Sequence, residues 1–289
     1  MLLCCALGDP LAGALSLSQA RELSKRARAI GIGEDDPLRD VTQKDVQKLG
    51  YSAFEAGHIV SLLRREQQLD GYLLAAEKAG VQVLTRLGGL FPRRLRDQLG
   101  PRCPAVLFCK GDLSLLQSRC ISVVGSRQLE PPGAAFAAQA GKLAAAEGFT
   151  LCSGDAAGAD RTAQSACLAN GGNALIFPAT ELVYCPNTAH TLYAAEDGFE
   201  LGFSAQRALS RNRLIHAMGE KTLVAQTGFG RGGTWSGSLD NLHHEYSPLF
   251  VHDDGSEGAR ALCARGATPV TELTSLHALS PAQLSFPIE

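Results

Sequence analysis

The segment Cys120–Asp160, CISVVGSRQLEPPGAAFAAQAGKLAAAEGFTLCSGDAAGAD, contains the pattern that decides the fold. CISVVGSR starts as an unalternated apolar run and ends in a glycine, a hydroxyl and a cation, whereas Gly133–Gly148 is rich in alanine and closes on a glycine. The first is typical of a strand buried on both faces, and the second of a helix with a glycine just past its end. A second apolar run, FTLCSG, then breaks into glycines. The segment predicts a βαβ unit with two glycine turns at the carboxyl edge of a parallel sheet, where open α/β folds bind ligands.

Strand-like and helix-like segments alternate outward from this unit, which favours a doubly wound α/β fold. Strands are expected at Val81–Leu87, Ala105–Gly111, ALIFP, Thr222–Thr227, PLFVH and TPVTEL, and helices at Arg161–Asn170, Ala189–Asp197, Ser210–Met218 and Gly258–Arg265. Residues 1–82 contain little glycine and resemble a small all-helical module of the helix-hairpin or SAM type, with an acidic turn at Gly33–Pro37. We therefore expect a helical module over 1–82, a mostly parallel sheet domain over 83–276 and a tail over 277–289.

The composition is that of an ordinary globular protein, and it favours neither a metal site nor a membrane span. The nine cysteines show no C-x-x-C and no Cys/His spacing typical of zinc, and no apolar run approaches the ~20 residues that a membrane span needs. Reduced thiols fit a cytoplasmic protein. The formal net charge is -2, so the average charge does not point to nucleic acid. Cations nevertheless cluster between Arg86 and Arg127, including Lys110, and again between Arg207 and Arg231, which leaves open whether they form a basic face.

Three short motifs favour phosphate binding, each against a plainer structural role. Glycine lets a backbone approach a ligand closely, turn amides form an anion-binding nest, and arginine is a two-pronged phosphate donor. The three motifs are Gly125-Ser126-Arg127, the turn that contains Ser153, Gly154 and Gly158, and the helix start Arg211-Asn212-Arg213. Two arginines at a helix start oppose the helix dipole unless an anion lies there. Asp160, at the end of the second motif, is expected to cap the helix that follows.

The loop GFGRGGTW matches G-x-G-x-x-G at Gly228, Gly230 and Gly233, with Asp253 and Asp254 some twenty residues later. This pattern is that of a dinucleotide site, although glycine-rich loops match it easily. The loop lacks the lysine of a P-loop, so ATPase chemistry is disfavoured.

Taken together in this order, the motifs resemble the DNA-processing protein A (DprA, also called Smf) family. The similarity begins near Leu49 and reaches GARALCARGATPV, which covers most of the chain. The family's glycine–Ser/Thr–arginine turn is matched by Gly125-Ser126-Arg127, and its S-G-x-A-x-G-x-D turn by Ser153 to Asp160. Its R-N-R-I-I helix start is matched from Arg211 to Ile215, and its Y-P segment by Tyr184-Cys185-Pro186, split by one residue.

The resemblance implies an extended Rossmann-like fold, single-stranded DNA as the ligand of a basic pocket, a homodimer, and the recombinase RecA as a partner in recombination during natural transformation. It implies no catalysis, no catalytic residue and no cofactor. Two departures mark a divergent member: Gln164 replaces the family's histidine, and Ala208-Leu209 replaces the Phe-Pro before Arg211, which removes an aromatic for base stacking.

Two other readings stay open. One is a nucleotide-binding sensor or phosphoribohydrolase similar to the "lonely guy" group, although the glutamate expected after Gly232-Gly233-Thr234 is missing. The other is an interaction scaffold with a vestigial pocket.

Overall fold

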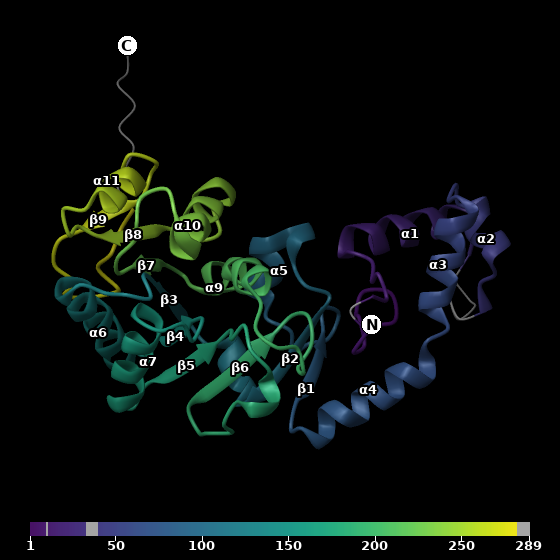
Figure 1. Ribbon diagram of the computed structural model, residues 1–289, viewed down its shortest axis with the longest axis horizontal. Coiled ribbons are helices and arrows are strands. Elements are labelled where there is room, and N and C mark those ends of the chain that lie inside the picture. The colour runs from purple at the N-terminus through teal and green to yellow at the C-terminus, as the bar shows by residue number, and fades with distance from the viewer. Residues whose placement is uncertain (10, 33–39, 282–289) are drawn as a thin grey trace, which may run out of the picture.

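A nine-stranded sheet is the centre of the computed structural model, which describes residues 1–9, 11–32 and 40–281 (Figure 1). The strands are β1 (Gln82–Thr85), β2 (Val106–Gly111), β3 (Cys120–Val124), β4 (Thr150–Ser153), β5 (Asn173–Ile176), β6 (Thr191–Ala195), β7 (Thr222–Val224), β8 (Leu249–His252) and β9 (Thr268–Val270). Their order is β1-β2-β6-β5-β4-β3-β7-β8-β9. The β1–β2 and β2–β6 pairs are antiparallel and the remaining pairs are parallel. The mostly parallel α/β sheet expected from the sequence is confirmed.

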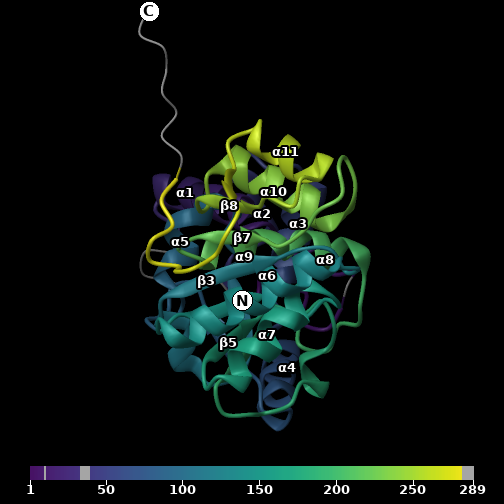
Figure 2. The same cartoon turned by 90° about the vertical axis from the view of Figure 1, so that its left-hand side faces the viewer.

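Helices cover both faces of the sheet, which is why the residues of β3 and β4 are buried without alternation. One face packs against α6 (Pro131–Ala146) and α7 (Ala159–Ala169), and the other against α5 (Arg93–Leu99), α9 (Asn212–Met218), α10 (Gly232–His244) and α11 (Glu257–Cys263). Figure 2 shows the helix pairs α10–α11 and α6–α7 on opposite sides of β3 and β7. A short helix, α8 (Ala205–Ser210), precedes α9 directly.

The chain reverses its direction of travel across the sheet between β3 and β7. It runs from β3 through β4, β5 and β6 toward one edge and then returns, so that β7 lies beside β3 on the other side. Val124 pairs with Val224 where these two parallel strands end. A topological switch point of this kind opens a crevice at the carboxyl ends of the strands.

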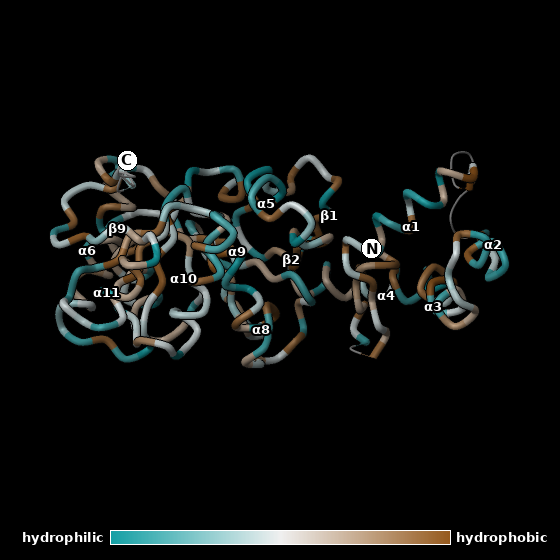
Figure 3. Tube along the Cα trace, turned by 90° about the horizontal axis from the view of Figure 1, so that it is seen from above, coloured by the Kyte–Doolittle hydropathy of each residue, from teal (hydrophilic) through white to brown (hydrophobic). Residues whose placement is uncertain are grey.

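The helical N-terminal region divides between two cores (Figures 1 and 3). Its helices are α1 (Leu17–Ala29), α2 (Gln43–Lys48), α3 (Ala53–Leu63) and α4 (Glu66–Lys78). Helices α1 to α3 share a small core of their own, whereas Tyr72 and Ala76 of α4 pack with Phe108 and Phe199 near the antiparallel edge of the sheet. α1 is largely hydrophilic and buries only Leu23 and Ala27. The module predicted over 1–82 is therefore split by its packing, with α4 joined to the sheet.

One predicted element is wrong. The helix expected at Ala189–Asp197 is the strand β6, which pairs with both β5 and β2. Alanine favours helix locally, but the central place of β6 in the sheet buries this segment on both faces and overrides the propensity. The predicted turn Gly33–Pro37 and most of the predicted tail 277–289 lie outside the described residues.

Candidate functional site

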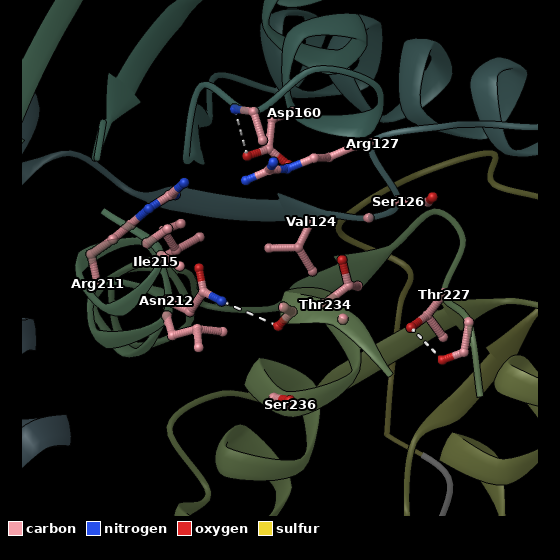
Figure 4. A pocket seen from close by; sticks show the side chains of 18 of the residues that line it. Val124, Ser126, Arg127, Asp160, Arg211, Asn212, Ile215, Thr227, Thr234 and Ser236 are labelled. Atoms are coloured by element: carbon pink, nitrogen blue, oxygen red, sulfur yellow. Dashed lines mark hydrogen bonds between the residues drawn. The ribbon is translucent and has the colours of Figure 1, made fainter. Parts of the chain in front are cut away.

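A pocket of about 680 Å³ lies at the switch point, at the carboxyl ends of β3 and β7 (Figure 4). Its size falls within the range of roughly 300–1,000 Å³ that is usual for small-ligand sites. The walls come from the turn after β3, the loop after β7 and the helices α8, α9 and α10. The polar residues that line it are Ser126, Arg127, Asp160, Arg211, Asn212, His216, Thr227, Arg231, Thr234 and Ser236.

The turns after β3 and β4 are fastened together behind the pocket. The Ala159 N–H donates to the Ser126 carbonyl at 3.1 Å, and a Cβ on Gly158 would lie 2.2 Å from that oxygen. Gly158 also has φ +80°, so glycine is required there for two reasons. A Cβ on Gly125 would lie 2.5 Å from the Cβ of Ala159. The glycines of both turns therefore permit close packing of β3 against the start of α7.

The amides of these turns are largely used within the protein, which differs from the nests expected there. The Ser126 N–H donates to the Gln226 carbonyl at 2.9 Å. The N–H groups of Gly154 and Ala156 both donate to Asp160 Oδ2, at 2.9 and 3.3 Å. What the β3 turn does offer is the Ser126 hydroxyl, whose oxygen accepts from the Gln128 N–H and whose proton can still be donated.

Asp160 does not cap α7, contrary to the sequence expectation. The N-cap position belongs to Gly158, and Asp160 lies within the first turn, where its carboxylate reaches back to the β4 turn. Burial raises the pKa of Asp160 to about 6, against the opposing effects of the Arg211 charge and of the two backbone donors. Asp160 thus holds the turn and places one carboxylate at the pocket wall.

Arg211 packs against Gly154, so the second and third sequence motifs lie side by side in the structure. A Cβ on Gly154 would lie 1.4 Å from Arg211 Nη1, so only glycine leaves room for the guanidinium. Arg211 Nε and Nη1 are buried, and within the described part of the chain they have no hydrogen-bond partner. A buried donor without a partner costs about 1–3 kcal/mol, more when it is charged, so this group is prepared for an acceptor that the described residues do not supply.

Two further arginines and the start of α10 complete the cationic lining. Arg127 is exposed, and its guanidinium lies 5.9 Å from the centre of the Phe203 ring. Phe203 is 57% exposed at the rim. Arg231 is the N-cap residue of α10 and provides no side-chain hydrogen bond to the helix, so the first-turn amides lack a side-chain cap. Helix N-termini of this kind attract anions.

Asn212 and His216 lie one turn apart on α9 and both line the pocket. Figure 4 shows the Asn212 amide reaching toward α10, where Nδ2 donates to the Gly233 carbonyl at 3.2 Å. The His216 side chain is 1% exposed, and no group in the described residues hydrogen-bonds its Nδ1.

Arg213 and Lys110, both predicted site residues, do not line the pocket and contact other parts of the protein. Arg213 forms an ion pair with Glu196 and donates to the Ser210 hydroxyl at 2.8 Å, so its charge is neutralised inside the protein. This pairing also resolves the conflict expected from two arginines near a helix start. Lys110 lies on β2, four strands from β3, and donates to the Val183 carbonyl at 2.8 Å. The Ser153 hydroxyl accepts a hydrogen bond from the Gln164 amide, and neither residue lines the pocket.

Sequence reasoning missed Phe203 and His216. Phe203 directly follows Gly202 in the loop GFELGFS, where an aromatic beside a glycine was the available signal, and His216 interrupts the apolar run LIHAM. Neither feature indicates which pocket the side chain enters. The described residues contain no cluster of three or more potential metal ligands, and none of their helices is long and apolar enough to span a bilayer.

Comparison with known proteins assigns the family. The model of the DNA recombination-mediator protein A family matches residues 82–280. DNA processing protein DprA of Bacillus subtilis (strain 168) is 25% identical over 243 residues, 80% of each chain. The structure of DprA from Streptococcus pneumoniae superposes with a TM-score of 0.70 at 23% identity, covering 90% of this chain and 92% of that one. DNA processing protein A from Helicobacter pylori, described for its single-stranded DNA binding mode, gives 0.56 at 22% identity over 67% of this chain and 92% of that one. Since the family model spans more than half of its residues, the chain belongs to the DNA recombination-mediator protein A family.

Proposed function

We propose that the chain acts as a recombination mediator by binding the sugar–phosphate backbone of single-stranded DNA in the switch-point pocket. The observation that carries the proposal is the buried Arg211 guanidinium, whose Nε and Nη1 lack partners among the described residues. It lines the same pocket as the start of α10, which lacks a side-chain cap. An arginine fork and helix amides are the donors that phosphate oxygens prefer.

The charge of the pocket supports an anionic ligand. Three arginines line it, Arg127, Arg211 and Arg231, while Asp160 is the one carboxylate among the described lining residues. The chain as a whole carries -2, so positive charge is concentrated at this site.

Phe203 at the rim supplies an aromatic surface in place of the one that the Ala208-Leu209 departure removes. Aromatic side chains next to a cationic groove are typical of single-strand binding, and each stacked base contributes about 1–3 kcal/mol. A duplex keeps its bases stacked, so this combination favours a single strand.

The proposal includes the expectations that go with the family resemblance. We propose that the protein is a cytoplasmic homodimer that delivers its bound strand to RecA and that it is not an enzyme. Asp160, the one carboxylate among the described lining residues, accepts through Oδ2 from two backbone N–H groups, which supports a structural role for it.

The test is binding of fluorescent oligo-dT across a salt series by the wild type, Arg211→Ala and Arg93→Ala. Each phosphate contact contributes roughly 0.7 to the slope of log K against log salt for a single strand, so three arginines predict a slope near -2. Arg211→Ala should weaken binding and lower the slope by about 0.7. Arg93, whose side chain is 85% exposed on α5, is the control and should leave both unchanged. Absence of salt-dependent binding by the wild type would refute the proposal.

One observation favours a second candidate, a nucleotide-binding sensor. The G-x-G-x-x-G loop follows β7 and leads into α10, and Asp253 follows β8, so the motif has the strand–turn–helix context that a dinucleotide site requires. The phosphoribohydrolase reading has no such support, because the segment after Gly232-Gly233-Thr234, where its glutamate is expected, is Ser236-Gly237-Ser238. Mononucleotides and dinucleotides that stabilise the protein thermally, with no oligonucleotide binding, would favour the sensor.

A further inference from the structure

Three arginines from separate elements meet where the helical N-terminal region joins the sheet. These junction arginines are Arg21 on α1, Arg86 directly after β1, and Arg96 on α5. α1 packs beside the 3-10 turn η2 (Gly100–Arg102) that follows α5, and Figure 1 shows α1 next to the side of the sheet domain that holds β1 and α5. Burial lowers the pKa of Arg86, and the nearby charges of Arg21 and Arg96 act in the same direction. None of the three lines the switch-point pocket.

The Arg86 side chain is anchored at this junction with one donor unused. Its backbone N–H donates to the Ala105 carbonyl at 2.8 Å, and its own carbonyl accepts from Arg96 Nη1 at 3.2 Å. Arg86 Nη1 is buried, and no group among the described residues hydrogen-bonds it. A buried donor without a partner is unfavourable, more so when it is charged. The junction therefore holds a cationic donor that only a ligand or solvent can satisfy.

No carboxylate of the described residues forms an ion pair with the junction arginines. The two carboxylates beside them in sequence are already paired with other arginines. Glu22 pairs with Arg26 at 2.8 Å on α1. Asp97 pairs with Arg93 at 3.3 Å on α5. The positive charge of the cluster is thus not balanced by its neighbours.

The Cys103 thiol, which also lies near Arg86, supplies no counter-charge either. Burial raises the pKa of Cys103 to about 11, although the charges of three neighbouring arginines oppose this shift. The thiol is therefore neutral at physiological pH. Like charges that share a partly buried site repel one another, and an anion placed between them replaces this repulsion with attraction.

A phosphate group is the anion that guanidinium groups bind best, because their paired N–H donors match its oxygens. Three guanidinium groups suit two or more linked phosphates, which carry several negative charges. We propose that Arg21, Arg86 and Arg96 form a second phosphate-binding site, which takes a polyphosphate group and links α1 to the sheet domain. A nucleoside polyphosphate, or the backbone of a DNA strand that extends beyond the pocket, supplies this chemistry. The site does not depend on the proposed function of the pocket.

The test is calorimetric titration with inorganic pyrophosphate. The parent protein is Arg211→Ala, which removes the buried donor of the switch-point pocket and should still bind pyrophosphate at the junction. Adding Arg21→Gln or Arg86→Gln should weaken this binding about ten- to hundredfold, the equivalent of one charge-assisted hydrogen bond. Arg93→Gln is the matched control, because Arg93 is 85% exposed on α5 and already paired with Asp97, and it should bind as the parent does.

Melting curves separate binding from a structural role. In phosphate-free buffer Arg21→Gln should melt no lower than the parent, because it removes a repulsion and no ion pair. Saturating pyrophosphate should raise the melting temperature of the parent and barely change that of Arg21→Gln. Arg21 is exposed, so this variant carries the comparison should Arg86→Gln not fold. Unchanged pyrophosphate affinity in Arg21→Gln, or an equal loss in Arg93→Gln, would overturn the site.

Competition identifies the source of the phosphate. The pyrophosphate-bound parent is challenged with ATP and with oligo-dT of about 30 nucleotides, longer than the roughly 4–16 nucleotides that one single-strand site covers. Displacement by oligo-dT that Arg21→Gln abolishes would assign the site to a DNA backbone, and displacement by ATP alone to a nucleoside polyphosphate. Displacement by neither would overturn the proposal. A wild type that binds no oligonucleotide but retains the pyrophosphate site would overturn the proposed function alone.

Discussion

Gly154→Ala should disable the site by displacing Arg211, without altering any charged residue. The added Cβ would lie 1.4 Å from Arg211 Nη1 and 2.1 Å from its Cζ, whereas ordinary contacts begin at 3.4 Å. The guanidinium must therefore move by about 2 Å or leave its position beside Gly154. Gly154 has no positive φ, so its backbone accepts alanine and the strain falls on the flexible end of the arginine side chain.

The expected loss follows from one charge-assisted hydrogen bond to phosphate. Such a bond contributes about 1.5–3 kcal/mol, which corresponds to a loss of about 10- to 150-fold in affinity for single-stranded DNA. The salt slope should fall by about 0.7, the contribution of one phosphate contact. Fluorescence anisotropy with oligo-dT across a salt series measures both quantities.

The double variant tests the mechanism. If Gly154→Ala acts through Arg211, the combination with Arg211→Ala should bind no worse than either single variant, because both remove the same contact. Gly71→Ala is the matched control, since a Cβ there meets nothing within 4 Å on the remote helix α4. Additive losses, or wild-type affinity for Gly154→Ala together with weakened binding by Arg211→Ala, would show that Gly154 does not act through Arg211.

Three further predictions concern single groups of the site. Because burial raises the pKa of Asp160 from 3.8 to about 6, the folded state binds the proton more tightly than the unfolded state, and stability should fall by about 3 kcal/mol as the pH rises from about 4 to 6. Asp160→Asn should flatten the melting temperature over that window, and an unchanged pH profile would contradict the assignment. Phe203→Ala should weaken oligo-dT binding by about 1–3 kcal/mol and barely affect an abasic strand, whereas equal losses on both would exclude stacking. Arg213→Ala should act on stability, because it leaves the largely buried carboxylate of Glu196 without its partner; the side chains of Arg213 and Glu196 are 15% and 11% exposed. Urea denaturation should show a loss of about 3–5 kcal/mol, and a stable variant with weakened DNA binding would instead place Arg213 in the interface.

The βαβ unit and its glycine turns were predictable because their causes are local. An apolar strand buried on both faces, an alanine-rich helix and a turn glycine each depend on neighbours within a few residues. The helix prediction at β6 was wrong because the cause of this strand is not local. Its alanines favour a helix, but the strand forms because β5 and β2 lie on either side of it, and those contacts are distant in sequence.

Which residues line the pocket depends on the directions in which their side chains point, and sequence spacing does not reveal these directions. Arg211 and Arg213 are two residues apart, and helical geometry turns such side chains by about 200°, so one faces the pocket and the other faces Glu196. Phe203 and His216 enter the pocket because loop and helix packing aims them there. The sheet architecture, the turns and the arginines near them can be predicted from the amino-acid sequence, because they follow from local periodicity and glycine chemistry. Which arginines remain unpaired, and which neutral groups line the pocket with them, depends on burial and ion pairing, and contacts between segments far apart in the chain set both.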